Sequence, residues 1–169
     1  MKNSQLSLCM IVKNEETNLD TCLKSVRTLV DEIIVVDTGS TDRSKEIALS
    51  HGAIIHDFPW NNDFSSARNE SLKYATGEWI LILDADEVLD TNDHSSIRQL
   101  IDGKDVDAYH LVQRTYQKQS TSADWISLEE VTELARGCHG YITSHLVRLF
   151  RNNEQICFKG RVHEQVEID

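Results

Sequence analysis

The chain has 169 residues, and its 17 Lys and Arg against 28 Asp and Glu give a formal net charge of −11. This length suits a single domain. Because 40% of the residues are hydrophobic and 27% are charged, the composition predicts a folded core and excludes a disordered chain. The acidic balance argues against a protein whose main task is to bind nucleic acid or anionic lipid, since neutralising phosphates requires clustered Lys and Arg.

No apolar run reaches the ~20 residues that a membrane-spanning helix needs. The first apolar run, Leu6 to Val12, is too short for a secretory signal and is followed closely by Asn14, Glu15 and Glu16. We therefore expect a cytoplasmic protein. The four cysteines lie far apart without a C-x-x-C pair, and we expect free thiols.

In the first half of the chain, short apolar runs alternate with stretches of helical periodicity. The runs that predict buried strands are 6–12, 33–36, 53–55 and 79–83. The stretches that predict helices run from Asn14, as the N-cap, to about Val30, from the 38–42 turn to Gly52, and from about 65 to 75. This alternation is typical of a parallel sheet with right-handed crossovers and helices on both faces.

The second half is less regular. The elements expected there are a short helix around 97–101, a strand over 108–116, and two strands at about 145–151 and 156–163. Asn152-Asn153 between the last two strands predicts a hairpin turn. The segment 117–138 is polar and irregular, and we expect it to be mobile. The fold class is therefore α/β, a mostly parallel twisted sheet followed by a mixed, partly antiparallel second half.

Aspartates follow two of the predicted buried strands, at Asp37 and Asp84. In open parallel sheets, ligands bind at the carboxyl ends of the strands, where loops converge. Asp84 and Asp86 flank Ala85 in a D-x-D motif, so both carboxylates can face one crevice. A divalent cation would relieve their mutual repulsion, and oxygen ligands favour Mg²⁺ or Mn²⁺ bound together with substrate phosphates. A solvated acidic turn is the plain alternative.

Four further residues are candidates for chemistry. Asp37 can accept the N–H of a nucleobase, or it can simply begin the turn into the next helix. Arg68, on the first turns of a predicted helix, is suited to bind a phosphate or to pair with a neighbouring carboxylate. His163 can complete a metal shell and Glu164 can act as a general base, or both can be polar residues of an edge strand.

Together these residues resemble the family 2 glycosyltransferases, which have the GT-A fold. The resemblance rests on four ordered blocks: Ile11–Glu15, Val35–Asp42, Phe64–Asn69 and Gly77–Glu87. It covers about residues 5–90 and extends more loosely to Gly160–Glu164, in a tail similar to that of bacterial members that modify cell-envelope glycans or peptides. It implies one domain over 1–169, with a nucleotide-sugar-binding half at about 1–90 and an acceptor-side half at about 91–169.

The resemblance implies metal-dependent, inverting transfer of a sugar from a nucleotide-sugar, usually UDP-linked, to a glycan, lipid-linked or peptide acceptor. Asp37 would hold the uracil, and Asp84 the ribose or the ion. Asp86 would bind Mn²⁺ or Mg²⁺, with His163 as a further metal ligand, and Arg68 would approach the diphosphate. The residues implied to contact the nucleotide-sugar are Val12, Asn14, Glu15, Asp37, Arg68, Asp84 and Ala85, and those implied in catalysis are Asp86 and Glu164.

The chain departs from the family pattern in several places. Many relatives carry Pro-x-Tyr-Asn-Glu after the first strand, where Ile11 and Lys13 replace the proline and the tyrosine. The catalytic base stays open among Glu164, Asp124, Glu129 and Glu130. Relatives also commonly continue past the His-Glu pair, whereas this chain stops at Asp169, which leaves open whether acceptor-binding parts are missing.

Two other functions stay open at this stage. A sugar-phosphate nucleotidyltransferase has a similar sheet, but its glycine-rich loop is missing, since Lys13-Asn14-Glu15-Glu16 holds no glycine. A nucleotide-sugar-binding module without turnover is the main alternative. We expect no nucleic-acid partner, and peripheral association with the inner face of the membrane remains an alternative to a purely cytoplasmic location.

Overall fold

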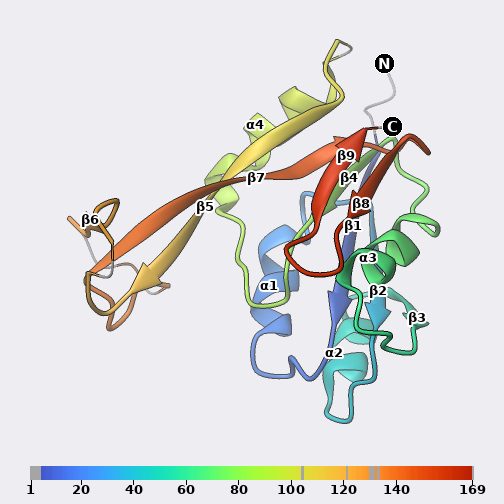
Figure 1. Ribbon diagram of the computed structural model, residues 1–169, viewed down its shortest axis with the longest axis horizontal. Coiled ribbons are helices and arrows are strands. Elements are labelled where there is room, and N and C mark those ends of the chain that lie inside the picture. The colour runs from blue at the N-terminus through green and yellow to red at the C-terminus, as the bar shows by residue number, and fades with distance from the viewer. Residues whose placement is uncertain (1–4, 104, 121, 130–131, 133, 169) are drawn as a thin grey trace. The chain divides into compact units, whose positions relative to one another are not determined.

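The computed structural model describes residues 5–103, 105–120, 122–129, 132 and 134–168 (Figure 1). The chain forms two compact units, which we call unit 1 (Met1–Tyr109 with Arg148–Asp169) and unit 2 (His110–Val147). Unit 1 contains the predicted alternation of strands and helices. Its parallel strands are β1 (Leu6–Val12), β2 (Glu32–Asp37), β3 (Ile54–Asp57) and β4 (Trp79–Ile82), and the helices between them are α1 (Leu19–Val26), α2 (Ser44–Ser50) and α3 (Phe64–Leu72). The predicted α/β class with a mostly parallel sheet is confirmed.

Strand β1 is the central strand of this parallel arrangement. It pairs in parallel with β2 on one side, where Cys9 lies opposite Ile34, and with β4 on the other, where Cys9 lies opposite Ile82. The order β3-β2-β1-β4 means that the chain moves outward through β2 and β3 and then returns to the far side of β1. This reversal is a topological switch point, and its carboxyl edge is where open sheets bind ligands.

Apolar side chains on both faces of the sheet hold unit 1 together. Leu6, Leu8 and Met10 of β1 are fully buried, as are Ile80 and Leu81 of β4. Helices α1 and α2 contact each other, whereas α3 contacts β1, β2 and β8. The connections through α1 and α2 move outward from β1 to β3, whereas the connection through α3 returns past β1 to β4. Because these crossovers are right-handed, α3 lies on the opposite face of the sheet from α1 and α2. Burial on both faces explains why these strands read as continuous apolar runs.

The predicted N-cap at Asn14 is wrong. Helix α1 begins at Leu19, and Asn18 occupies the N-cap position. Asn14 instead adopts a left-handed backbone conformation, with φ of 56°. Its side-chain Oδ1 accepts a hydrogen bond from the Thr41 backbone N–H at 2.8 Å. Asparagine tolerates this conformation better than most residues, so Asn14 serves the loop that follows β1 rather than the helix.

The second half of the sequence adds antiparallel strands. Its elements are η1 (Thr91–Asp93), α4 (His94–Ile101), β5 (Ala108–Gln117), β6 (Ile126–Ser127), β7 (Gly140–Arg151), β8 (Ile156–Lys159) and β9 (Gln165–Ile168). Strand β7 pairs antiparallel with β4, and Leu149 lies opposite Leu81. Strand β8 pairs with β9 in a separate two-stranded sheet. The partly antiparallel character predicted for this half is therefore present.

The hairpin predicted at Asn152-Asn153 is wrong, because β8 pairs with β9 and not with β7. Asn152 is anchored to the loop before β4, since its Nδ2 donates to the carbonyl oxygens of Ala75 and Gly77 at 3.0 and 2.9 Å. The strand predicted over 156–163 ends at Lys159. Positive φ at Gly160 and His163, 100° and 56°, turns the chain into β9.

Unit 2 contains the middle of the chain. Tyr116 and Tyr141 pack edge to face with ring centroids 6.0 Å apart, and the Arg114 guanidinium lies 5.2 Å from the Tyr141 centroid. Strand β6 pairs with β7 through Ile126 and Tyr141. The segment predicted to be irregular, 117–138, therefore includes one short strand. Glu130, a candidate catalytic base, lies outside the described residues.

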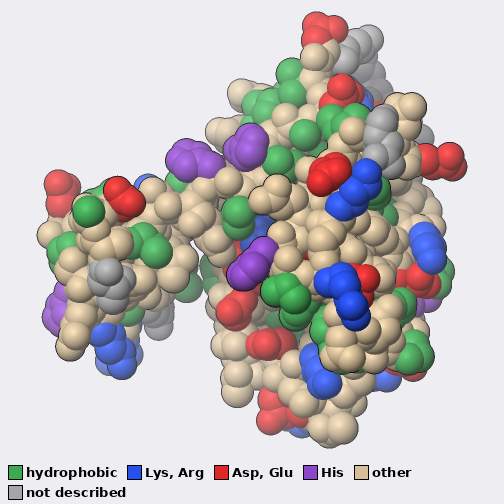
Figure 2. All heavy atoms as spheres, in the orientation of Figure 1, with side chains coloured by type: hydrophobic (Ala, Val, Ile, Leu, Met, Phe, Trp, Pro, Cys, Tyr) green, Lys and Arg blue, Asp and Glu red, His purple; other side chains and the backbone are tan. Residues whose placement is uncertain are grey.

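The described surface shows no concentration of basic charge on the face drawn in Figure 2, where Lys and Arg side chains are interspersed with Asp and Glu. Among the described residues, no helix is both long enough and apolar enough to cross a membrane. Of the cysteines predicted to be free thiols, Cys9 and Cys22 are buried.

Asn69 links α3 to β8 and generates a prediction about stability. Its Nδ2 donates to the Phe158 carbonyl oxygen and its Oδ1 accepts from the Phe158 N–H, both at 2.8 Å. Asn69→Ala leaves both backbone groups without this partner, so we expect the free energy of unfolding in urea to fall by about 2 kcal/mol. Asn153→Ala is the control, because Asn153 accepts from Gln155 at an exposed turn. Equal losses in the two variants would contradict this role.

Candidate active site

The loops after β1 and β2 are joined at the carboxyl edge of the sheet. The hydrogen bonds between them run from Asn14 N to Ser40 Oγ (2.9 Å), Glu15 N to Ser44 Oγ (2.7 Å), Glu16 N to Asp42 Oδ2 (3.0 Å) and Thr41 N to Asn14 Oδ1 (2.8 Å). Val12, the last residue of β1, is buried, and its carbonyl oxygen accepts from the Thr38 N–H at 2.9 Å. These contacts fix the backbone around the predicted nucleotide-binding residues of the first loop.

Asp37 lies at the end of β2, and its side chain is only 1% exposed. Its Oδ1 accepts from the backbone N–H groups of Gly39 and Ser40 at 3.0 and 2.9 Å, and Lys45 Nζ lies 3.6 Å away. The other oxygen, Oδ2, is buried and has no hydrogen-bond partner. Buried polar atoms almost always have a partner, so this oxygen is suited to accept a hydrogen bond from a ligand.

The D-A-D turn, which we define as Asp84–Glu87, directly follows β4 and Leu83. The Glu87 N–H donates to the Asp84 carbonyl oxygen at 3.0 Å, and the Asp84 N–H donates to Glu87 Oε2 at 2.8 Å. Ala85 is buried. Asp86 is exposed, and within the part of the chain that the structure describes it has no hydrogen bond or ion pair. The two aspartates of the motif therefore have different surroundings.

Asp84 belongs to a network of charged side chains. Arg68 Nη2 lies 2.7 Å from Asp84 Oδ1, and Arg148 Nη2 lies 3.0 Å from Asp84 Oδ2. Arg68 Nε also contacts Glu164 Oε1 at 2.5 Å, and Arg148 Nη2 contacts Glu87 Oε1 at 2.7 Å. Two arginines thus face three carboxylates. The sequence analysis did not identify Arg148 and Glu87 as site residues. The available signal for Arg148 was an arginine between Val147 and Leu149 in an apolar strand.

The network shifts the ionisation of its members. Burial opposes charge on Asp84, but attraction to Arg68 and Arg148 outweighs it and lowers its pKa below the usual 3.8. Burial also opposes charge on Arg68, yet Asp84 and Glu164 raise its pKa. Burial raises the pKa of Glu87, and attraction to Arg148 offsets this only partly. Arg68 keeps one buried donor, Nη1, without a partner, which is compatible with a contact to an anionic ligand.

The predicted metal ligands do not form a preassembled cage. Within the described residues, no group of three or more His, Cys, Asp or Glu side chains is placed to hold an ion. His163 is exposed in the loop between β8 and β9. Both oxygens of Asp84 contact arginines, which leaves the Asp86 carboxylate available. One such carboxylate fits Mg²⁺ or Mn²⁺, because these ions are commonly held by one or two carboxylates, substrate phosphates and water.

The candidate bases differ in their surroundings. The Glu164 side chain is 11% exposed and pairs with Arg68, so the two residues predicted to act on the donor and the acceptor contact each other. Asp124 and Glu129 belong to unit 2.

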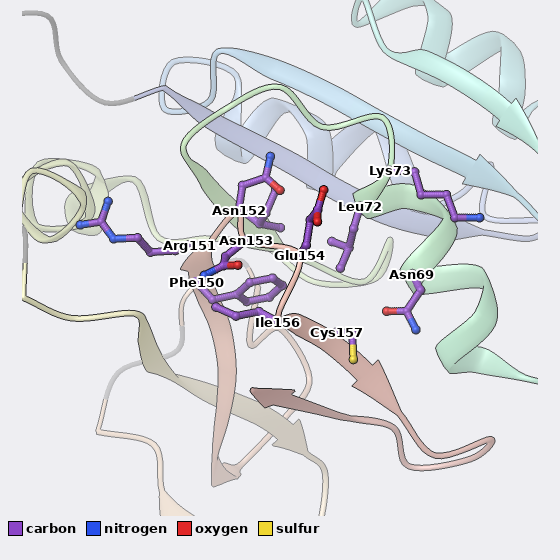
Figure 3. Close-up of a pocket in the computed structure, with 11 residues that line it drawn as sticks. Asn69, Leu72, Lys73, Phe150, Arg151, Asn152, Asn153, Glu154, Ile156 and Cys157 are labelled. Atoms are coloured by element: carbon purple, nitrogen blue, oxygen red, sulfur yellow. The ribbon is translucent and has the colours of Figure 1, made fainter. Parts of the chain in front are cut away.

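A hollow of about 240 Å³ lies elsewhere in unit 1, between α3 and the turn from β7 to β8 (Figure 3). Leu72, Phe150 and Ile156 form part of its lining. Its Asn69 and Asn152 side chains already bond backbone groups of this chain. Ile80 near the start of β4 also lines it, so this hollow lies toward the edge of the sheet opposite the D-A-D turn.

Asp84→Asn tests the energetic role of the network. Because Asp84 is 34% exposed, solvent screening reduces the value of its ion pairs, and we expect a loss of about 1–3 kcal/mol in unfolding free energy at pH 7. The folded pKa lies below the unfolded one, so this contribution is fully present above the unfolded pKa and disappears as pH falls through the folded pKa. The difference between wild type and variant, measured by urea unfolding, should therefore shrink below pH 3.8.

The control is Asp86→Asn, which removes an exposed carboxylate two residues away. It should leave the unfolding free energy nearly unchanged across the same pH range. A pH-independent difference between wild type and Asp84→Asn would mean that the ion pairs do not contribute as described.

The sequence of this chain is similar to those of several known proteins. Residues 7–160 match the family model described as Glycosyl transferase family 2. A TPR repeat-containing protein of Synechococcus elongatus is 40% identical over 164 residues, which cover 97% of this chain and 36% of that protein. The SPbeta prophage-derived glycosyltransferase SunS of Bacillus subtilis is 34% identical over 164 residues, 92% of this chain and 33% of that protein. The chain thus spans about a third of the length of these relatives.

Solved structures share the fold. Glucosyl-3-phosphoglycerate synthase from Mycobacterium tuberculosis, solved in complex with UDP, has a TM-score of 0.54 at 24% identity and covers 62% of this chain and 43% of its own. S. aureus TarS 1–349, solved in complex with UDP-GlcNAc, has a TM-score of 0.52 at 25% identity and covers 58% of this chain and 31% of its own. The GT-A type of fold predicted above is therefore confirmed.

Proposed function

This chain belongs to glycosyl transferase family 2, and from that premise we propose that it binds a UDP-sugar and transfers the sugar to an acceptor with inversion. The observation that carries the proposal is the unpartnered, buried Oδ2 of Asp37 at the carboxyl edge of the sheet. A carboxylate only accepts hydrogen bonds. Uracil offers a ring N–H at its pairing edge, whereas cytosine has an acceptor nitrogen there, so this oxygen favours uridine over cytidine nucleotides.

The remaining donor contacts follow from the same edge. The unpartnered Nη1 of Arg68 supports a role for this residue at the diphosphate. The Asp86 carboxylate would hold Mn²⁺ or Mg²⁺ together with diphosphate oxygens, and His163 would be an additional ligand. The bound cation would supply Lewis-acid stabilisation of the leaving diphosphate. The M. tuberculosis synthase has itself been solved with UDP and either Mn²⁺ or Mg²⁺.

Fewer observations support the acceptor side of the proposed reaction. Glu164 is the proposed base, which would take the proton of the attacking acceptor group in a single displacement. Its contact with Arg68 would have to lengthen for this, for example when the diphosphate engages Arg68. A glycan, a lipid-linked glycan or a peptide is the proposed acceptor. A cytoplasmic protein, with peripheral membrane association as the alternative, is the proposed setting.

One observation favours a second candidate, a nucleotide-sugar-binding module without turnover. The proposed base Glu164 is 11% exposed, and its Oε1 is paired with Arg68 Nε in this arrangement. A module of this kind would bind UDP-sugars through Asp37 and Asp86 and would leave the chemistry to another part of a longer protein.

Donor binding is tested by thermal unfolding with UDP, UDP-glucose, UDP-GlcNAc, CDP and GDP, each with and without Mn²⁺. We expect uridine nucleotides with Mn²⁺ to raise Tm by about 5 °C or more at 100 times Kd, because a ligand that binds only the folded state stabilises it. Asp86→Asn should lose the part of the shift that depends on Mn²⁺. Asp107→Asn is the matched control, since Asp107 lies beside Arg151 at the amino end of β4. No shift with any uridine nucleotide would reject the proposal.

Turnover separates the two candidates. We expect release of UDP from a UDP-sugar in the presence of Mn²⁺, and we expect Glu164→Gln to lower kcat by at least about 100-fold, as loss of a general base does. Uridine nucleotide binding by isothermal titration without any hydrolysis or transfer would instead favour the binding module. Glu167→Gln is the control, because Glu167 is an exposed neighbour that pairs with Lys159.

A further inference from the structure

Strand β7 places the Arg148 side chain in contact with the D-A-D turn. Leu149 lies opposite Leu81 in the antiparallel pair of β7 and β4, so Arg148 lies alongside the carboxyl end of β4. Its side chain is 12% exposed, and its Nη2 contacts both Asp84 Oδ2 at 3.0 Å and Glu87 Oε1 at 2.7 Å. Arg148 therefore joins the side chains of the first and last residues of the turn.

The backbone of the turn is closed by its own hydrogen bonds. Glu87 Oε2 accepts from the Asp84 N–H, while Glu87 Oε1 contacts Arg148. The Glu87 N–H in turn donates to the Asp84 carbonyl oxygen. Each end of the turn is thus held both to the other end and to the same guanidinium. Asp86 lies between these ends, and the direction of its carboxylate depends on a backbone that Arg148 holds in place.

We infer that Arg148 is a positioning residue, which orients the D-A-D turn so that Asp86 faces the diphosphate and cation of the donor. This inference rests on the proposed function, which it deepens by adding a residue that would contact no substrate. It follows from a contrast within the same four-residue turn. The Asp84 carboxylate pairs with two arginines, whereas the Asp86 carboxylate has no hydrogen bond or ion pair among the described residues. Mutation of residues that orient a metal ligand typically weakens metal binding by about 10- to 100-fold.

A purely structural role is the competing explanation. Replacing all members of a buried ion pair with apolar side chains often leaves stability unchanged or improves it, but removing one partner alone is destabilising, so a loss of stability in an Arg148 variant does not by itself distinguish the two roles. The two roles differ in what they predict. A structural role predicts a change in unfolding free energy alone, whereas a positioning role predicts a change in how the turn exchanges its amide hydrogens and binds Mn²⁺.

The chain offers a matched control on the same strand. Arg151 lies three residues further along β7, where its Nη2 donates to the Gly103 carbonyl oxygen and its guanidinium lies 4.6 Å from the Trp79 ring centroid. It is also a partly buried arginine, but it contacts no part of the D-A-D turn. Arg148→Met and Arg151→Met therefore remove the same chemical group from one strand.

The experiment has two readouts. In the ligand-free protein, hydrogen exchange at the Asp84 and Glu87 amides should accelerate by about 10-fold or more in Arg148→Met and by less than about 2-fold in Arg151→Met. With UDP present, Mn²⁺ titrations followed by electron paramagnetic resonance should show about 10- to 100-fold weaker binding in Arg148→Met and near-wild-type binding in Arg151→Met.

The conservative variant adds a further check. Because both contacts of Arg148 come from a single nitrogen, one ammonium group can replace it, and Arg148→Lys should recover part of the exchange protection and of the Mn²⁺ affinity. If Arg148→Met does not fold, Glu87→Gln serves instead, since glutamine retains an acceptor for the Asp84 N–H but loses the charge that attracts Arg148. Its expected loss of Mn²⁺ affinity is several-fold.

The possible outcomes are distinct. Turn exchange and Mn²⁺ affinity that stay at wild-type values in a folded Arg148→Met protein would overturn the inference, whatever its stability. Equal effects in Arg148→Met and Arg151→Met would overturn it as well. Failure of the wild-type protein to bind any uridine nucleotide with Mn²⁺ would reject the proposed function, while the exchange measurement on the ligand-free protein would still decide whether Arg148 orders the turn.

Discussion

The charge balance around Asp84 is the interaction on which the rest of the site depends. A carboxylate at the end of a buried strand loses part of its hydration, and Arg68 and Arg148, each paired with one of its oxygens, outweigh that loss and lower its pKa. These arginines come from α3 and β7, and Arg68 continues the network to Glu164 beside β9. One carboxylate thus joins four segments of unit 1 at the edge where a parallel sheet binds ligands.

The aspartates at this edge have separate tasks as a result. Asp84 has its acceptor capacity taken up by arginines, so its contribution is to hold the turn. Asp37 and Asp86 each keep acceptor oxygen available, one buried at the end of β2 and one exposed on the turn after β4. A buried acceptor suits a flat base with a single N–H, and an exposed carboxylate suits a hydrated cation bridged to phosphates. The division of roles comes from burial and neighbours, since the three side chains are chemically identical.

Much of the fold could be predicted because its signals are local. Runs such as 6–12 and 79–83 are apolar on both faces, and such runs form the inner strands of a covered parallel sheet. Asn14 and Asn152 were misassigned for a shared reason. Asparagine favours caps and turns, but both of these side chains bond backbone groups of a distant segment. No local sequence pattern reveals that partner.

The sequence by itself determined the four parallel strands, that aspartates come at the ends of two of them, and that the chain resembles its family in ordered blocks. Only the tertiary structure decided how those aspartates are paired. Arg68 and Glu164 are 96 positions apart, and Arg148 and Asp84 are 64 apart. Local periodicity carries no information over such separations, because it reports which face of an element is buried. Which charge lies opposite which is set when α3, β4, β7 and the loop before β9 pack together.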